Sequence, residues 1–358
     1  MCADGRRPAS RRAKRGDAVG AAASGTEDRA VLTVLVAIHH RVVAWTIPDA
    51  YVSELQRRFP RVRFLRSQDC EADQSLAPQA DVVFALAFTK DAATRATRLR
   101  WIHGSGHAVG HFPLADLASR GIALTNSRGI QATPIAEHVM ACLLALARQL
   151  PDALRRQGQR AWAPNDLVGP AAPWLLSGRT LGIIGMGSLG QAIATRAKAF
   201  GMRVVGARRH PERGAPPSVD QVVAHTDLGD MLEQADVVVL AAPWTPESDR
   251  LLDARAMARM KAGALVINVA RGQLLDEAAL VSALESGKLG GAALDVFATE
   301  PLPPDSPLWS MRNVIITPHS SGFRLGHFDA VIDLFAENLR RFERGDDLLN
   351  RVDLQAGY

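Results

Sequence analysis

The stretch "LGIIGMGSLGQAIATRAKAFGMRVV", residues 181–205, has the pattern of a strand, a tight turn, a helix and a second strand. Its glycines Gly185, Gly187 and Gly190 have the spacing G-x-G-x-x-G. In such a turn the first glycine permits the bend, the second lets the backbone approach a pyrophosphate, and the third lets the helix pack closely on the strand. The start of the helix then directs unpaired N–H groups at the phosphates. This order of elements predicts a dinucleotide-binding domain.

The end of the second strand indicates which dinucleotide is bound. A site specific for NAD presents Asp or Glu there to the ribose hydroxyls. This chain has Arg208 and Arg209 instead. Exposed arginines are commonly only solvated charges, but two guanidinium groups can also hold a 2′-phosphate through paired hydrogen bonds. Because the acid is missing, we expect NADP(H) to be favoured over NAD(H).

Three further strands each end in a polar group. "GALVINVARG" ends near Arg271, "GGAALDVFATEP" carries Asp295 and Glu300, and "NVIITPHSSG" carries His319. Each residue alone has a structural explanation, but the carboxyl ends of parallel strands meet at one edge of a sheet. We therefore expect Arg271 to hold a substrate carboxylate and polarise a carbonyl. His319 would exchange a proton with the carbonyl oxygen, and Glu300 would orient the imidazole.

From about residue 30 onward the chain resembles the D-isomer-specific 2-hydroxyacid dehydrogenases, in particular the branch that is similar to glyoxylate/hydroxypyruvate reductases. The resemblance is carried by "GIIGMGSLGQAIA", "ADVVVLAAPWTPES", "INVARGQLLDEAALVSALESGKLGGAALDVFATEPLPPDSPLW" and "NVIITPHSSG". It implies the same catalytic set of Arg271, Glu300 and His319, and a contact between Asp295 and the nicotinamide carboxamide. It also implies a cofactor site lined by Thr133, Ser188, Leu189 and Pro243.

The resemblance further implies that backbone amides of the loop "GSGHAVGHF", residues 104–112, bind the substrate carboxylate. Ser105, Gly106 and His107 match this role best. The loop departs from the family pattern, because Ala108 and Gly110 stand where a glycine and an acidic residue are expected. The three histidines in and beside it, His103, His107 and His111, lack a metal-ligand spacing, so we expect no metal.

The chain of 358 residues is long enough for two domains. Strand and helix patterns alternate over residues 30–128 and again from residue 180, which predicts an α/β protein with two doubly wound parallel sheets. We expect a Rossmann cofactor domain at 129–319. The resemblance implies that a smaller, discontinuous, flavodoxin-like substrate domain is made of 30–128 plus 320–358. Between them, Thr133 is expected to cap a long helix that begins at Pro134.

Charge and composition exclude other classes of partner. Residues 1–20 carry a net +4 of the total of +5, so the remaining 338 residues are nearly neutral and lack the basic face of a nucleic-acid binder. We expect residues 1–29 to be a disordered basic tail. No apolar run suits a membrane span, and three scattered cysteines favour the cytoplasm. The family arrangement and the arm rich in Trp and Pro at 162–174 favour a homodimer formed through the cofactor domain.

The function that we expect is reduction of a small 2-oxo acid by NADPH. Two alternatives stay open. One is an NAD-linked enzyme similar to 3-phosphoglycerate dehydrogenase, which would more often carry an acid near position 208. The other is a dinucleotide-sensing binding protein on the same fold, with negligible turnover; the retained catalytic set argues against it.

Overall fold

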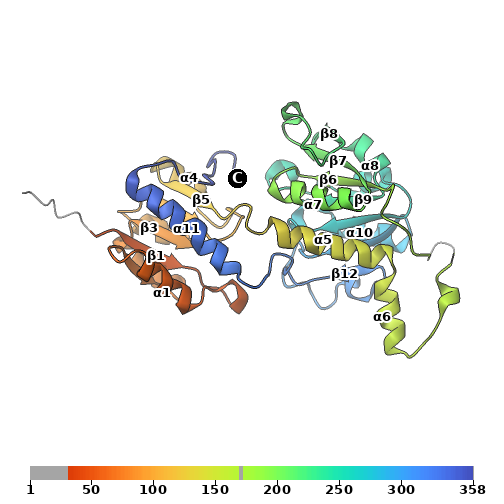
Figure 1. Cartoon of the computed structure of the whole chain (residues 1–358), viewed down its shortest axis with the longest axis horizontal. Helices are drawn as coiled ribbons and strands as arrows, with labels where there is room; N and C mark the ends of the chain where they lie inside the picture. The colour runs from red at the N-terminus through yellow and green to blue at the C-terminus, as the bar shows by residue number, and fades with distance from the viewer. Residues whose placement is uncertain (1–30, 169–171, 358) are drawn as a thin grey trace, which may run out of the picture. The chain divides into compact units, whose positions relative to one another are not determined.

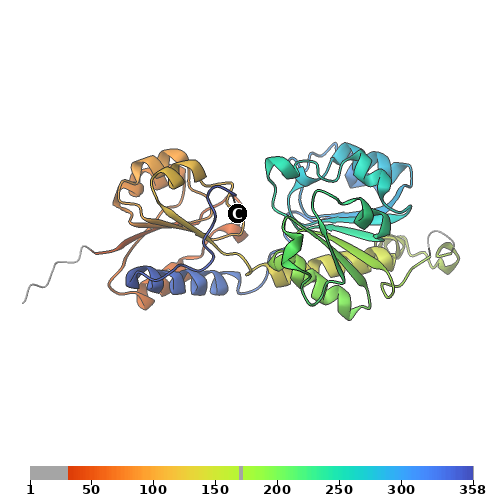
Figure 2. The same cartoon turned by 90° about the horizontal axis from the view of Figure 1, so that it is seen from above.

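The computed structural model describes residues 31–168 and 172–357. These residues form one five-stranded and one seven-stranded sheet, and helices cover both faces of each sheet (Figures 1 and 2). All strand pairs within the two sheets are parallel. The prediction of an α/β protein with two parallel sheets is therefore confirmed. The predicted tail at 1–29 lies outside the described residues.

The first sheet has the strand order β2-β1-β3-β4-β5, which is the flavodoxin-like order. Its strands are β1 (Thr33–Ala37), β2 (Arg63–Arg66), β3 (Val82–Ala85), β4 (Trp101–Gly104) and β5 (Ala123–Asn126). The helices on its two faces are α1 (Asp49–Arg58), α2 (Cys70–Leu76), α3 (Lys90–Arg95), α4 (Leu114–Ser119) and α11 (His327–Arg344). Every residue of β1, β3 and β4 is buried, as expected for parallel strands that are covered on both faces.

The C-terminal helix α11 packs on this first sheet although it follows the second sheet in the chain (Figure 2). Its Phe335 stacks on Phe84 of β3 with ring centroids 4.1 Å apart. Asn338 on the same face is fully buried, and its amide forms two hydrogen bonds with the backbone of Leu349, at 2.7 and 3.0 Å. The observed packing is consistent with a discontinuous domain, but its boundaries at 128/129 and 319/320 stay predictions.

The second sheet has the order β12-β11-β10-β9-β6-β7-β8, which is a Rossmann order with one strand added. Its strands are β6 (Thr180–Ile184), β7 (Arg203–Arg208), β8 (Gln221–Ala224), β9 (Val237–Leu240), β10 (Ala264–Asn268), β11 (Leu289–Leu294) and β12 (Val314–Ile316). The helices around it are α5 (Ala132–Ala147), α7 (Ser188–Ala199), α8 (Gly229–Gln234), α9 (Ala254–Arg259) and α10 (Glu277–Glu285). Two apolar clusters, one on each face, hold these helices to the sheet.

The predicted start of α5 is wrong. The helix begins at Ala132 with Gln131 as its N-cap residue, and no side chain caps it. Thr133 is already helical, because the preceding turn joins the helix directly: the N–H of Ala132 donates to the Gly129 carbonyl at 3.2 Å. Pro134 still lies in the first turn, where a missing N–H removes no helical hydrogen bond.

After α5 the chain forms a second helix, α6 (Leu150–Gly158), which is followed by a short 3-10 helix at Pro164–Asp166. Figure 1 shows α6 standing away from the seven-stranded sheet. We call residues 150–168 and 172–175 the arm; its exposed large apolar side chains are Leu150, Leu154, Trp162, Leu167, Val168 and Leu175. Trp162 is 95% exposed, which is unfavourable for so large an apolar ring in water. Among all the described residues, no helix has the length and apolar character needed to cross a membrane.

Candidate active site

The turn between β6 and α7 has a geometry that only its glycines permit. Gly185 has φ +105°, and a Cβ there would lie 2.5 Å from the backbone nitrogen of Ala242. A Cβ on Gly190 would lie 2.0 Å from the carbonyl oxygen of Gly185. Around Gly187, by contrast, the space is open within 4 Å. The first and third glycines are thus fixed by packing, while the second leaves room for a ligand, which fits a dinucleotide pyrophosphate at the start of α7.

Pro243, Ser188 and Leu189 lie around the same turn. Ser188 and Leu189 are the first two residues of α7, and Pro243 follows Ala242 just beyond the end of β9. Strands β6 and β9 are adjacent, and the order of the strands reverses between them. Ligands of doubly wound sheets bind at this position. Thr133 lies exposed on α5, and its part in the cofactor site stays a prediction.

The two arginines after the glycine turn have different surroundings. Arg208 is the last residue of β7, and its Nη1 donates to the carbonyl oxygen of Gly214 at 3.2 Å. Arg209 has an acidic neighbour, since its Nη2 lies 3.9 Å from Oε2 of Glu247. Arg208 is therefore the better placed of the two to bind an added phosphate, because its side chain is held by a carbonyl rather than by a carboxylate.

Arg271 is held just beyond the end of β10 by a buried asparagine. Asn268, the last residue of that strand, is fully buried and donates to the Arg271 carbonyl at 2.9 Å. Its Oδ1 accepts from the N–H of Ala270 at 3.1 Å. The guanidinium donates to the carbonyl of Ala270 at 2.5 Å, and burial lowers its pKa while the charge of Glu300 raises it. A partly buried guanidinium of this kind suits a carboxylate ligand.

Glu300 and His319 form a hydrogen-bonded pair, with Glu300 Oε2 2.7 Å from His319 Nδ1. Both side chains are about one-third exposed. Burial by itself raises the pKa of Glu300, but hydrogen bonds from His319 and from the Phe297 N–H hold the pKa below its usual value. Because an ionised carboxylate can only accept, Nδ1 carries the hydrogen and Nε2 is left to exchange a proton with a ligand.

The backbone of His319 is in an unusual conformation. Its φ of +51° lies in the left-handed region, which costs a residue other than glycine about 1–2 kcal/mol. The carboxylate of Asp295, 1% exposed, stabilises the loop by accepting from the N–H groups of Ser320 and Ser321 and from the hydroxyl of Thr317. Asp295 thus has a structural task in this loop, and its contact with nicotinamide stays a prediction.

Among the three loop residues predicted to bind the substrate, Ser105 is already engaged. Its N–H donates to the Ala85 carbonyl at 2.8 Å, so the candidate anion-binding amides narrow to those of Gly106 and His107. Partial burial, and then the nearby charges of Arg271 and His319, lower the pKa of His111 in the same loop.

The structure places an aromatic residue that the sequence did not single out, Trp45, beside His319. Trp45, in a turn at Val43–Trp45 after β1, meets the imidazole edge to face with ring centroids 5.3 Å apart. Its ring also lies 6.2 Å from that of Phe323 and 4.4 Å from that of His40. Only the position of Trp45 after the carboxyl end of a strand could have drawn attention to it.

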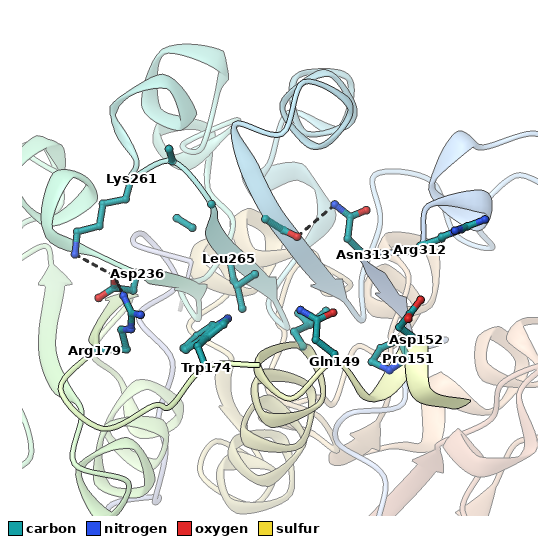
Figure 3. A pocket seen from close by; sticks show the side chains of 15 residues that line it. Gln149, Pro151, Asp152, Trp174, Arg179, Asp236, Lys261, Leu265, Arg312 and Asn313 are labelled. Carbon is teal, nitrogen blue, oxygen red and sulfur yellow. Dashed lines mark hydrogen bonds and ion pairs between the residues drawn. The ribbon is translucent and has the colours of Figure 1, made fainter. Parts of the chain in front are cut away.

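A polar pocket of about 250 Å³ lies at the other edge of the seven-stranded sheet, at the amino ends of its strands (Figure 3). Its charged groups are largely paired with one another. Asp236 accepts from Lys261 at 3.1 Å, from Arg179 at 3.3 Å and from the Thr180 N–H at 2.8 Å. We interpret this pocket as structural, since it lacks the glycine turn and the His–Glu pair. Within the described ranges, His, Cys, Asp and Glu side chains do not cluster as a metal site requires.

The sequence also matches known proteins. Residues 140–321 match the family model of the D-isomer specific 2-hydroxyacid dehydrogenase, NAD binding domain. A glyoxylate reductase of Korarchaeum cryptofilum is 34% identical, over 86% of this chain and 93% of that protein. A D-3-phosphoglycerate dehydrogenase of Methanocaldococcus jannaschii is also 34% identical, over 74% of this chain but only half of that protein's length.

A solved D-isomer specific 2-hydroxyacid dehydrogenase of Xanthobacter autotrophicus Py2, in complex with NADPH and MES, is similar in structure. It has a TM-score of 0.74 and 31% identity, and the match covers 91% of this chain and 99% of that one. The chain belongs to the D-isomer-specific 2-hydroxyacid dehydrogenase family. It is therefore an NAD(P)-dependent oxidoreductase that acts on small hydroxy or oxo acids.

His103, one of the three unusual histidines, belongs to the core of the first sheet. It is fully buried on β4, with Nδ1 2.7 Å from the Thr125 hydroxyl and Nε2 3.3 Å from the Ser127 hydroxyl. The Trp101 indole donates to Thr125, and Ser127 donates to the Gly104 carbonyl. A neutral imidazole satisfies every side-chain polar atom in this group of four residues, and burial lowers the pKa of His103 to about 3.

We predict that His103 makes the protein less stable in acid. The unfolded imidazole binds a proton near pH 6.5 and the folded one only near pH 3, so the free energy of unfolding falls as the pH falls through that range. Replacing His103→Gln should reduce the slope of this free energy against pH by about one proton. Denaturant unfolding between about pH 7 and pH 4 measures the slope, with exposed His210→Gln as the control. An unchanged slope in His103→Gln would contradict the prediction.

Proposed function

We propose that the protein reduces a small 2-oxo acid of the glyoxylate or hydroxypyruvate type, with NADPH as the favoured reductant. The observation that carries this proposal is the His319–Glu300 pair, at 2.7 Å, beside the carboxyl ends of the adjacent strands that also position Arg271. The glyoxylate reductase relative supports the choice of substrate. The described cysteines, Cys70 and Cys142, are free thiols, which supports a cytoplasmic location that cell fractionation would test.

The proposed mechanism assigns one task to each side chain. Arg271, together with the amides of Gly106 and His107, binds the substrate carboxylate and draws electron density from the neighbouring carbonyl. His319 donates a proton from Nε2 to the carbonyl oxygen, and Glu300 keeps the imidazole oriented and stabilises its protonated form. NADPH held at the glycine turn would supply the hydride that the carbonyl carbon accepts. In the opposite direction His319 takes the proton back.

The cofactor preference rests on β7 and the turn after it. The strand ends in Arg208 rather than in an acid, and a carboxylate at this position would repel a 2′-phosphate. The relative from Xanthobacter that was solved with NADPH supports the same choice. Gly185, Gly187 and Gly190 would hold the pyrophosphate, with the first N–H groups of α7, at Ser188 and Leu189.

The surroundings of His319 support a small substrate. The centroid of the Trp45 ring lies 5.3 Å from that of the imidazole, and this large ring leaves little space for a long side chain on the oxo acid. The alternatives are an NAD-linked enzyme similar to 3-phosphoglycerate dehydrogenase and a binding protein without turnover. The first is favoured by the relative from Methanocaldococcus, and neither is supported by the residues at the end of β7.

The first prediction of this proposal concerns turnover. The wild type should oxidise NADPH in the presence of glyoxylate or hydroxypyruvate, followed by the loss of nicotinamide absorbance. His319→Gln should lower kcat by about 10²–10⁴-fold, because it removes the proton donor, and should leave NADPH binding unchanged. Binding of NADPH with negligible turnover of every 2-oxo acid tested would favour the sensing protein. Turnover of 3-phosphoglycerate with NAD alone would favour the other alternative.

A second prediction concerns the cofactor. The protein should bind NADPH more tightly than NADH, and Arg208→Asp should reverse the preference, because it exchanges a phosphate ligand for a group that repels phosphate. Titration followed by quenching of tryptophan fluorescence measures both affinities. Arg255→Asp, at an exposed position on α9, is the matched control with the same change in charge. Equal affinities in the wild type would make Arg208 an ordinary surface charge.

We also propose that two copies of the chain associate through the cofactor domain, with the arm, residues 150–168 and 172–175, in the interface. Its exposed apolar side chains favour burial against a second copy. The wild type should have the mass of a dimer by light scattering, and the double change Leu154→Asp with Trp162→Asp should give monomers. Val43→Asp, at an 85% exposed apolar residue outside the arm, should leave the dimer intact. A wild type that is monomeric at every concentration would refute the proposal.

A further inference from the structure

The loop that carries His319 is tied to helix α5 by a side chain that the mechanism above does not use. His138 lies on α5, and its Nε2 is 3.2 Å from the hydroxyl oxygen of Thr317, 179 residues away in the chain. Thr317 lies two residues before His319, directly after β12. We propose that His138, acting through Thr317, is a positioning residue that keeps His319 in its reactive orientation. This inference rests on the proposed function, in which His319 is the proton donor.

The direction of each hydrogen bond follows from the buried carboxylate. Asp295 Oδ1 lies 2.6 Å from the Thr317 hydroxyl, and a carboxylate only accepts, so Thr317 donates its single hydrogen to Asp295. The Thr317 oxygen can then only accept from His138. Nε2 of His138 must therefore carry a hydrogen and donate it. The result is an ordered series of donors from His138 to Thr317 to Asp295.

Asp295 extends this series to the backbone of the catalytic loop. Its Oδ1 also accepts from the Ser320 N–H at 2.9 Å, and its Oδ2 accepts from the Ser321 N–H at 3.0 Å. The N–H of His319 donates to the Asp295 carbonyl at 2.9 Å. The residues on both sides of His319 are thus held by one carboxylate. A left-handed residue such as His319 keeps its conformation only while its surroundings enforce it.

The position of His138 gives the loop a rigid attachment. Helix α5 is buried along one face, through Ala136, Val139 and Leu143, in the apolar cluster on one face of the seven-stranded sheet. The loop at 317–321, in contrast, belongs to no strand or helix. A hydrogen bond from a packed helix to the start of such a loop restricts its movement more than bonds within the loop can.

The neighbouring thiol of Cys142 does not give His138 a different role. Cys142 Sγ lies 3.5 Å from the same Nε2 of His138, which suggests a cysteine–histidine nucleophile. Burial, and then the charge of Asp295, raises the pKa of Cys142 to about 11. A neutral buried thiol is a poor nucleophile and at most a weak acceptor, so Thr317 remains the principal partner of His138.

The test uses pairs of variants that differ only in the hydrogen bond. Thr317→Val removes the hydroxyl and keeps the shape, while Thr317→Ser keeps the hydroxyl. His138→Leu removes the donor, while His138→Gln places an amide N–H near the position of Nε2. We expect Thr317→Val and His138→Leu each to lower kcat for the 2-oxo acid at least about tenfold, with KM for NADPH unchanged. Thr317→Ser and His138→Gln should restore most of this loss.

The double change of Thr317→Val with His138→Leu separates positioning from general damage. If His138 acts through Thr317, the double variant should be about as active as Thr317→Val alone, because each change breaks the same series of bonds. Thr94→Val, at an exposed threonine of α3, is the control and should keep wild-type kcat. All rates are divided by the concentration of sites that bind NADPH, so a poorly folded fraction does not count as lost catalysis.

Three outcomes would overturn the proposal. These are unchanged kcat in Thr317→Val and His138→Leu, equal losses in the leucine and glutamine variants of His138, and multiplicative losses in the double variant. If Thr317→Val does not fold, the His138 pair alone still decides the question. A wild type that binds NADPH but turns over no 2-oxo acid would refute the proposed function instead, before any variant is compared.

Discussion

The parallel register of β10, β11 and β12 is the constraint on which the site depends. Because the three strands run in the same direction and are neighbours, their carboxyl ends lie at one edge, and the loops that follow must meet there. Arg271, Glu300 and His319 come from those loops. The close approach of Gly272 to Phe297 brings the first two loops together: a Cβ at Gly272 would lie 1.9 Å from the Phe297 carbonyl carbon. An antiparallel arrangement of the same strands would separate these side chains.

Much of the fold could be predicted because its signals are local. Runs such as "ADVVVL" are typical of strands that are buried on both faces of a sheet. The glycine spacing at 185–190 indicates a tight turn that other residues would not permit. The strand ends that carry Arg271 and His319 followed from the same patterns. The start of α5, in contrast, was not predicted correctly. Thr133 has the right residue type for a cap, but the turn at 127–131 leads into the helix two residues earlier, and side-chain preference yields to that connection.

The parts of the site that could not be predicted depend on contacts between distant residues. His138 meets Thr317 across 179 positions, and Trp45 reaches His319 from a turn after the first strand. No spacing pattern in the sequence indicates that these residues are in contact. The hydrogen bond from the Ser105 N–H to the Ala85 carbonyl could not be predicted either, because it depends on how far β4 continues beside β3. At these positions only the packed structure shows which partner each group has.

The two edges of the seven-stranded sheet show why the chemistry belongs to one of them. At the amino edge, Asp236 is surrounded by Arg179, Lys261 and the Thr180 N–H, so its charge is neutralised within the protein (Figure 3). At the carboxyl edge, the start of α7 and the guanidinium of Arg271 present positive charge to whatever binds there. This positive charge stabilises an anionic cofactor and an anionic substrate at the carboxyl edge.

The backbone of His319 is strained at the same edge of the sheet. Asp295 compensates that strain with hydrogen bonds that a ligand does not need to supply. In the proposed mechanism, in which His319 is the proton donor, the orientation of its imidazole is thereby fixed before substrate arrives, so the free energy of binding is not consumed in arranging it.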